Sequence, residues 1–153
     1  MKSTKDILTK LGACTEAVKW AGRKTPKKAW ETCKRGDWLL WIASKLDIDR
    51  KKLVLAACAC ARTALKYVPV GEDRPRIAIE TAEAWTRGEA TIEQVRTAAR
   101  AAASAAADAA YAAARAASAA AYAAARKDIA DIVRKIIPFS DIKEAIAEYE
   151  GKA

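Results

Sequence analysis

Residues 98–125 read AARAAASAAADAAYAAARAASAAAYAAA, and this stretch decides the fold class. Alanine, which has the highest intrinsic helix propensity, occupies 21 of its 28 positions. No proline or glycine occurs between Thr91 and Pro138, and Thr91 with Gln94 makes a capping box at the start of that interval. The sequence therefore predicts one long helix over residues 91–137.

The residues of this stretch that are not alanine recur every three or four positions. They are Arg100, Ser104, Asp108, Tyr111, Arg115, Ser118 and Tyr122. At about 100° per residue they share an arc of roughly 80° and form a polar stripe about 33 Å long. In an unbroken helix Ile129, Val133 and Ile136 lie on the same arc, so we expect the stripe to face inward or to line a cleft. A solvated stripe is the alternative.

The stripe combines groups that suit an acidic, ring-containing ligand. Arginine guanidinium groups match phosphate and carboxylate geometry, and the tyrosine rings offer flat faces. Asp108 can pair with one arginine and leave another for an anion. The predicted ligand is therefore a nucleotide-like molecule.

Two residues outside the stripe are also candidates for ligand binding. Arg62 is the only charged residue between Leu53 and Leu65. It either reaches into a pocket or, as we favour, pairs with a carboxylate of Asp37, Glu80 or Glu83. Trp38 shares a helical face with Trp41, and the pair forms either core anchors or a stacking platform.

Helix signals fill the rest of the chain, and strand signals are nearly absent. Thr25-Pro26 has the pattern of an N-cap followed by proline in the first turn. The predicted elements are basic N-terminal helices within 1–52, a buried helix over 50–66, a helix over 75–87, the long helix over 91–137 and a short helix over 140–150. We expect an all-α fold, a single domain over 1–153 in which a helical bundle packs around the alanine-rich helix.

Charge is unevenly distributed along the chain. The formal net charge is +9, and residues 1–52 hold 14 Lys and Arg against 6 Asp and Glu. A basic N-terminal third favours an acidic partner, which can be a nucleotide, a protein surface or a nucleic acid. Lysines that only keep the surface soluble are the alternative. The alanine faces also permit homo-oligomers.

Signals of catalysis, metal binding and membrane insertion are missing from the sequence. It has no histidine, no Cys-x-x-Cys pair, no glycine-rich phosphate loop and no nucleophile elbow, so we expect neither an enzyme nor a cofactor. The four cysteines fit buried free thiols, with a Cys14–Cys33 link as the alternative. Without a signal-peptide pattern or an apolar run of membrane-spanning length, the expected location is cytoplasmic.

A family resemblance rests on four motifs in a fixed order. These are CKRGDWLLW at 33–41, CAR at 60–62, AIETAEAWTRGEAT at 78–91 and the alanine array. Over roughly residues 10–137 the chain resembles the putative immunity-protein family of bacteria and phages. The resemblance implies a small helical protein that neutralises a toxin, or counters a defence system, by binding.

The sequence therefore favours three possible functions. The first is sequestration of an acidic ligand, such as a nucleotide immune signal, in a cleft over the alanine-rich helix. The second is inhibition of a toxin or defence protein through the basic N-terminal region with Trp20 and Trp30. The third is nucleic-acid binding, for which no recognition-helix signature occurs.

Overall fold

The chain is helical throughout the part that the structure describes. The computed structural model describes residues 3–103 and 119–152, and every regular element in these ranges is a helix. The predicted all-α class is confirmed. The chain groups into two compact units: unit 1 joins Met1–Asp49 to Arg126–Ala153, and unit 2 is Arg50–Ala125. Organisation as a single domain stays a prediction.

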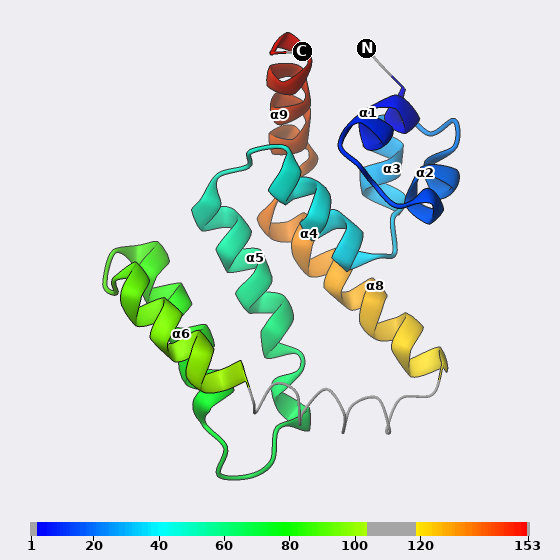
Figure 1. Cartoon of the computed structure of the whole chain (residues 1–153). Coiled ribbons are helices and arrows are strands. Elements are labelled where there is room, and N and C mark those ends of the chain that lie inside the picture. Colours follow the sequence, from blue (N-terminus) through cyan, green and yellow to red (C-terminus); the bar gives the residue numbers. More distant parts are fainter. Residues whose placement is uncertain (1–2, 104–118, 153) are drawn as a thin grey trace. The chain divides into compact units, whose positions relative to one another are not determined.

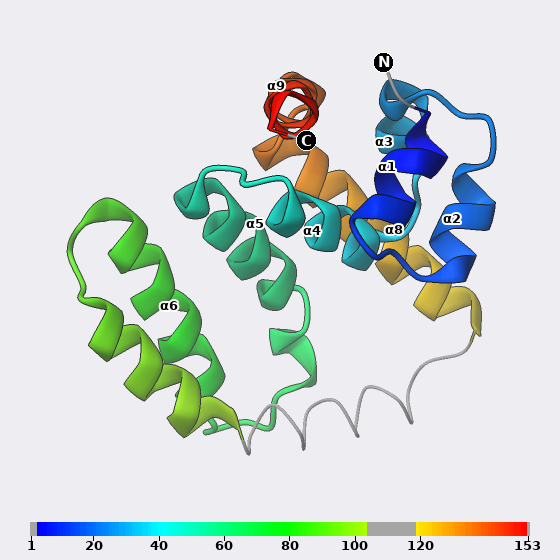
Figure 2. The same ribbon diagram turned by 45° about the horizontal axis from the view of Figure 1, so that its top comes forward.

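Unit 1 is built from both ends of the chain. Its helices are α1 (Thr4–Lys10), α2 (Thr15–Ala21), α3 (Pro26–Thr32), α4 (Gly36–Lys45), most of α8 (Ala119–Ile136) and α9 (Phe139–Gly151). The short helices α1, α2 and α3 lie together, as Figures 1 and 2 both show, and α3 also contacts α9.

Side chains at the starts of α1 and α3 accept hydrogen bonds from backbone N–H groups that have no partner within the helix. Ser3 and Asp6 form a capping box at the start of α1. The Thr25 hydroxyl accepts a hydrogen bond from the backbone N–H of Lys28 at 3.3 Å, and Pro26 fills the first turn of α3. The start predicted at Thr25-Pro26 is confirmed.

The helices α4 and α8 approach each other closely at Gly36. A Cβ atom on this glycine would lie 2.1 Å from Cγ2 of Ile129 and 2.8 Å from the backbone nitrogen of Ala130. The close approach therefore requires the absence of a side chain. The buried core of unit 1 includes Ile7, Trp30, Leu39, Ala43, Leu46, Ala130, Val133, Ile137, Ile142 and Ile146.

The buried face of α8 differs in part from the predicted one. Val133 is fully buried as expected, but Ile129 and Ile136 are only half-buried. Ala130 and Ile137 are fully buried instead. The backbone of Ala130 is also close to Gly36 of α4, so the contact between the two helices lies on the side of α8 that carries Ala130.

Unit 2 contains α5 (Arg50–Arg62), the 3-10 helix η1 (Leu65–Tyr67), α6 (Arg74–Arg87) and a helical stretch over residues 92–103. Gly88 ends α6 in the left-handed conformation, with φ of 80°, where glycine is favoured. The predicted capping box follows. The Thr91 backbone N–H donates to Oε1 of Gln94 at 2.7 Å, and the Gln94 N–H donates to Oγ1 of Thr91 at 3.2 Å.

The helix α5 is shorter and more exposed than the buried helix predicted over 50–66. It ends at Arg62, because the Thr63 N–H bonds to the Cys60 carbonyl three residues back and tightens the chain toward η1. Within α5 Ala56 and Cys58 are buried, whereas Leu55 is 37% exposed. An all-apolar sequence does not by itself bury every face of a helix.

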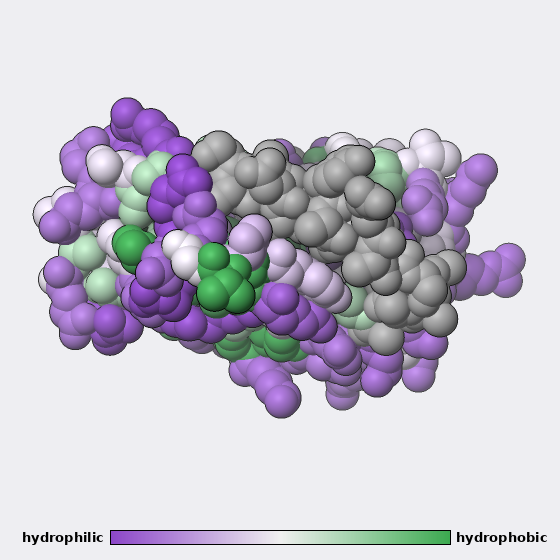
Figure 3. All heavy atoms as spheres, turned by 90° about the horizontal axis from the view of Figure 1, so that it is seen from below, coloured by the Kyte–Doolittle hydropathy of each residue, from purple (hydrophilic) through white to green (hydrophobic). Residues whose placement is uncertain are grey.

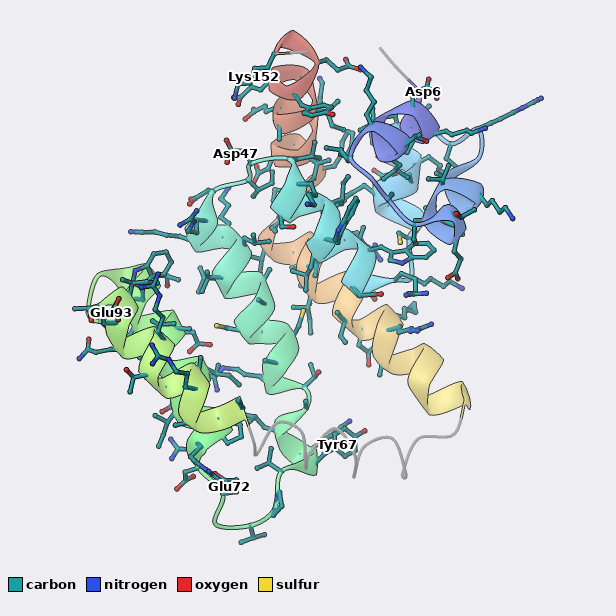
Figure 4. All side chains as sticks on the ribbon, viewed as in Figure 1. Asp6, Asp47, Tyr67, Glu72, Glu93 and Lys152 are labelled. Atoms are coloured by element: carbon teal, nitrogen blue, oxygen red, sulfur yellow. The ribbon has the colours of Figure 1, made fainter. Side chains whose placement is uncertain are left out.

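The turns before α5 and α6 carry acidic side chains at the surface. Asp47, labelled in Figure 4, follows α4 with φ of 57°, a left-handed conformation that aspartate tolerates. Glu72, also labelled there, accepts a hydrogen bond from Nε of Arg74 at 2.7 Å. Most of the coloured surface in Figure 3 is likewise hydrophilic, with small separate hydrophobic patches.

Candidate functional site

Unit 1 contains a cavity of about 410 Å³, within the range typical of small-molecule sites. Side chains of α1, α2, α3, α4 and α9 line it. Four of the chain's five tryptophans are among them, namely Trp20, Trp30, Trp38 and Trp41. We call this space the tryptophan cavity. Aliphatic side chains, including Ile7, Leu39 and Ile146, make up most of the remaining wall.

Two of these tryptophans contact each other from different helices. Trp20 on α2 and Trp38 on α4 have ring centroids 6.1 Å apart and planes inclined by 64°. This edge-to-face geometry is favoured because the positive ring edge meets the negative ring face. Trp38 and Trp41 are both half-buried and both line the cavity, so they face the same space from α4.

Trp30 is the most buried of the four and has an unsatisfied polar group. The residue is 4% exposed, and its Nε1–H has no hydrogen-bond partner in the described part of the chain. A buried donor without an acceptor destabilises a folded protein by about 1–3 kcal/mol. Trp30 therefore places an unpaired indole donor in the interior of unit 1.

Positive charge lies against two of the lining tryptophans. Nζ of Lys24 is 4.3 Å from the ring centroid of Trp20, and Cζ of Arg35 is 4.5 Å from that of Trp38. Both distances are within the range of cation–π attraction. Lys24 and Arg35 thus lie against tryptophans of the apolar cavity, and we call these two residues the basic rim.

The one charged side chain among the residues that line the cavity is Asp37. Arg35 donates to both its carboxylate oxygens, from Nε at 2.8 Å and from Nη2 at 2.6 Å. This bidentate hydrogen bonding is the main reason why the pKa of Asp37 lies below its usual value. Asp37 is consequently ionised and paired at neutral pH.

Cys33 lines the same cavity but is a poor nucleophile. It is 3% exposed, and burial raises the pKa of its thiol, so the reactive thiolate is scarce at neutral pH. All four cysteines are free, with Cys14 exposed and Cys33 and Cys58 buried. The cysteines are free as predicted, but Cys14 is exposed and Cys60 is only half-buried; the alternative Cys14–Cys33 link is absent.

The predicted ligand-binding residues do not all lie in the described part of the chain. Arg100 is described, and its side chain is exposed. Tyr122 belongs to α8, but the structure does not describe its side chain. The remaining stripe residues lie outside the described part of the chain, namely Ser104, Asp108, Tyr111, Arg115 and Ser118. The cleft over the alanine-rich helix therefore stays a prediction.

Arg62 and Trp38 occupy different units. Arg62 forms a bidentate ion pair with Glu83 of α6, at 2.8 Å from Nε and 2.7 Å from Nη2. Pairing with a carboxylate was the favoured alternative for Arg62, and Glu83 is the partner. Trp38 is the one predicted ligand-binding residue with a described side chain that lines the tryptophan cavity.

The cavity is not among the predicted features, although the sequence carries a signal for it. Four tryptophans fall between residues 20 and 41, a concentration that the chain shows nowhere else. The predicted contact surface included Trp30, and this is wrong because Trp30 is buried in unit 1. Trp30 belongs to α3, which contacts α9, a helix distant in sequence.

Within residues 3–103 and 119–152 no three His, Cys, Asp or Glu side chains gather as a metal site would require. In these ranges no helix combines the length and the apolar character needed to span a bilayer.

Comparison with known protein families identifies the family of the chain. A family model described as "Imm-5 like putative immunity protein" matches residues 45–146, about two thirds of the chain. The match includes all of unit 2 but none of the four tryptophans of the cavity. No curated protein and no solved structure matches the chain.

Proposed function

Because the chain belongs to the Imm-5 like putative immunity protein family, we propose that it neutralises a toxin by binding it and not by catalysing a reaction. The observation that carries the proposal is the basic rim of unit 1. There, Lys24 and Arg35 lie over tryptophan rings. Two exposed lysines, Lys27 and Lys28, follow on α3.

The rim combines side chains that are common in protein interfaces. Tryptophan and arginine are enriched where proteins bind each other, because they offer a large contact area with a polar or charged tip. Lys24 and Arg35 are each held over a tryptophan ring, so less side-chain entropy is lost when a partner binds. The rim is therefore partly preorganised for contact.

The charge of this region favours an acidic partner. Lys27 and Lys28 on α3 are exposed, and Lys27 lies only 3.9 Å from Glu31 in a weak surface pair. The surplus of Lys and Arg in residues 1–52 would attract an acidic surface over a distance of about one Debye length, roughly 8–10 Å at physiological salt. The proposed partner is an acidic protein surface on the toxin.

A binding experiment with charge variants tests this proposal. The tagged protein would capture its partner from a lysate of the producing organism, and the partner would then be purified and its affinity measured by calorimetry. Lys27→Glu with Lys28→Glu should weaken binding at least about tenfold, because two attractive contacts become repulsive. The double variant should also fail to protect cells that express the partner.

The matched control carries the same change of charge in unit 2, as Lys66→Glu with Arg96→Glu. It should bind and protect like the original protein. Undiminished affinity of the Lys27/Lys28 variant would contradict the proposed surface. A partner that is not toxic when expressed alone would contradict the neutralising function itself.

Sequestration of a nucleotide signal by the polar stripe stays a separate prediction. Small molecules released by heating the protein, purified from signalling cells, would be identified by mass spectrometry. Arg115→Ala should abolish the release if the stripe binds a nucleotide, and should leave toxin binding unchanged. Steep loss of affinity with salt for DNA or RNA would instead indicate nucleic-acid binding.

A further inference from the structure

We infer that a groove between α6 and the helix over residues 92–103 binds the same groove of a second copy of the chain, so that the protein forms a twofold symmetric dimer through unit 2. We call this surface the hairpin groove. The basic rim, which the proposed function uses for contact with a toxin, belongs to unit 1. The two surfaces can therefore be tested separately.

The hairpin groove is formed by one face of each of two consecutive helices, which lie side by side in Figures 1 and 2. Its volume is about 830 Å³, and every lining residue that the structure describes belongs to α6, to the turn after it or to the helix over 92–103. The lining residues within each helix are three or four positions apart, so each set lies on one helical face.

The groove is on a side of α6 that α5 does not cover. The side of α6 that packs against α5 carries Ile79, which is 8% exposed and whose carbonyl oxygen lies 3.8 Å from Sγ of Cys58. At about 100° per residue, the lining residues Ile77, Thr81 and Ala84 lie roughly 140–160° around the helix from Ile79. The groove face is thus available to a partner.

The side chains of the groove suit another helix. Thr81, Ala84 and Ala98 are short, which allows a second helix to pack with its axis about 8 Å away. Apolar surface is also left uncovered in this unit. Of the described residues, the large hydrophobic ones that are exposed all belong to unit 2, namely Leu55, Tyr67, Val70, Ile77 and Ile92. Ile77, 46% exposed, lines the groove itself.

The charges of the groove favour a second copy over a strongly charged partner. Each of its three charged lining residues forms an exposed ion pair, at 2.9 Å, 2.7 Å and 2.6 Å: Glu80 with Arg76, Arg87 with Glu89, and Glu93 with Arg96. These six charges sum to zero, and exposed pairs are weak enough to exchange partners. A surface of mixed sign does not repel a copy of itself, whereas a strongly basic or acidic one does.

A twofold axis beside Ala84 makes the groove complementary to itself. Two α6 helices packed antiparallel about this axis bring Glu80 of each copy to Arg87 of the other, because these residues lie four positions before and three positions after Ala84. In the same register the large Ile77 of each copy meets the small Ala90 of the other. The dimer thus has two ion pairs between copies and short side chains where the helices cross.

The size of the face sets the expected strength of the dimer. α6 has 14 residues and is therefore about 21 Å long. A face made of two helices of about this length buries on the order of 1,000 Å² in total, near the lower end of specific interfaces. We expect a dissociation constant in the micromolar range.

Sedimentation velocity of the full chain, at concentrations from roughly 1 to 200 µM, brackets such a dissociation constant. The average mass should rise with concentration from that of one chain toward twice this value. Ile77→Glu should weaken dimerisation at least about tenfold, because it places a carboxylate in an apolar contact.

Ile92→Glu is the matched control for Ile77→Glu. Ile92 is also 46% exposed and belongs to the same pair of helices, but it lies about 160° around its helix from the lining residue Gln94. This variant should dimerise like the original protein. Equal weakening by the two substitutions would place the contact elsewhere and overturn the inference.

Reversing one charge at a time tests the twofold axis. Glu80→Arg places like charges opposite each other at both contacts, and so does Arg87→Glu, so each variant alone should dimerise at least about tenfold more weakly. An equimolar mixture of the two variants restores opposite charges at both contacts and should dimerise like the original protein. Circular dichroism melts verify the fold of each variant, whose replaced residue is exposed.

The outcomes are distinct. A chain that stays monomeric at the highest concentration overturns the inference, and so do charge variants that fail to associate when mixed. A monomeric chain whose Ile77→Glu variant loses affinity for the toxin would assign the groove to the toxin instead of a second copy. The mass measurements do not involve the toxin, so their failure leaves the proposed neutralising function to its own experiment.

Discussion

Arg134 on α8 holds the backbone of Cys33 at the end of α3, with its Nη1 donating to the Cys33 carbonyl oxygen at 2.7 Å. The same nitrogen donates to the carbonyl oxygen of Trp30 at 3.1 Å, and Asp131 accepts from Nη2 at 2.9 Å. The last carbonyls of a helix have no donor within the helix. The guanidinium group therefore replaces the missing donors and fixes the position of the Trp30 backbone.

Replacing Arg134 should destabilise unit 1 substantially. Arg134→Met keeps the aliphatic part of the side chain but leaves two carbonyl groups without their charged donor, and hydrogen bonds to charged groups each contribute about 1.5–3 kcal/mol. We expect a loss of roughly 2–3 kcal/mol in the free energy of unfolding, measured by urea denaturation with circular dichroism. Arg96→Met, which breaks an exposed pair with Glu93 labelled in Figure 4, should change it by less than about 0.5 kcal/mol.

Adding one methyl group at Gly36 should destabilise the protein even though alanine favours helices. The new Cβ would lie 2.1 Å from Cγ2 of Ile129, so α4 and α8 must move apart. Overpacking of this kind typically costs about 1–3 kcal/mol. A Cβ atom at Gly151, at the end of α9, would meet nothing within 4 Å, so Gly151→Ala should be neutral or slightly stabilising. Thermal melts of the two variants measure the difference. An equal effect of the two substitutions would contradict the close approach.

The ion pair between Arg62 and Glu83 should stabilise unit 2 only above acidic pH. Hydrogen bonding from Arg62 lowers the pKa of Glu83 in the folded protein. The ion pair therefore stabilises the fold above the unfolded pKa of about 4.3, and this stabilisation is lost as the pH falls through the lowered folded pKa. Glu83→Gln should cost up to about 1 kcal/mol at pH 7 and close to nothing near pH 2, by urea denaturation. Glu144→Gln makes the same substitution at an exposed position on α9 and is the matched control.

The cysteines should react with a thiol reagent in the order of their exposure. At pH 8 we expect rapid labelling of the exposed Cys14 and labelling at least about tenfold slower at Cys33 and Cys58, because burial raises the pKa of both thiols. Mass spectrometry of labelled peptides measures each rate. Cys14→Ser should remove its rapid labelling, and rapid labelling of Cys33 or Cys58 in this variant would disprove the burial of these two thiols.

Features that depend on neighbouring residues were predictable from the sequence. The N-cap at Thr25 and the capping box of Thr91 with Gln94 were both predicted and observed, because their hydrogen bonds join residues three positions apart. The helix predicted over 75–87 is observed as Arg74–Arg87, since Pro75 and Gly88 mark its ends. The helical periodicity was sufficient to predict the all-α class.

Features that depend on distant residues were not predictable. The Trp30 carbonyl accepts a hydrogen bond from Arg134, 104 positions further along the chain, and no local pattern encodes that contact. The same holds for the close approach of Gly36 on α4 to Ile129 and Ala130 on α8. The tryptophan cavity required α1 to α4 and α9 to be brought together, so only Trp38 of its wall was among the predicted ligand-binding residues.

The composition of unit 1 from both ends of the chain has a consequence for synthesis on the ribosome. Residues 50–125 form a continuous unit that can fold as soon as it emerges. The first 49 residues cannot form their contacts with Arg134 and Ile146 until α8 and α9 have been synthesised. Until then the four tryptophans remain accessible to chaperones, and a ribosome that stalls before residue 126 would release a chain that lacks this half of unit 1.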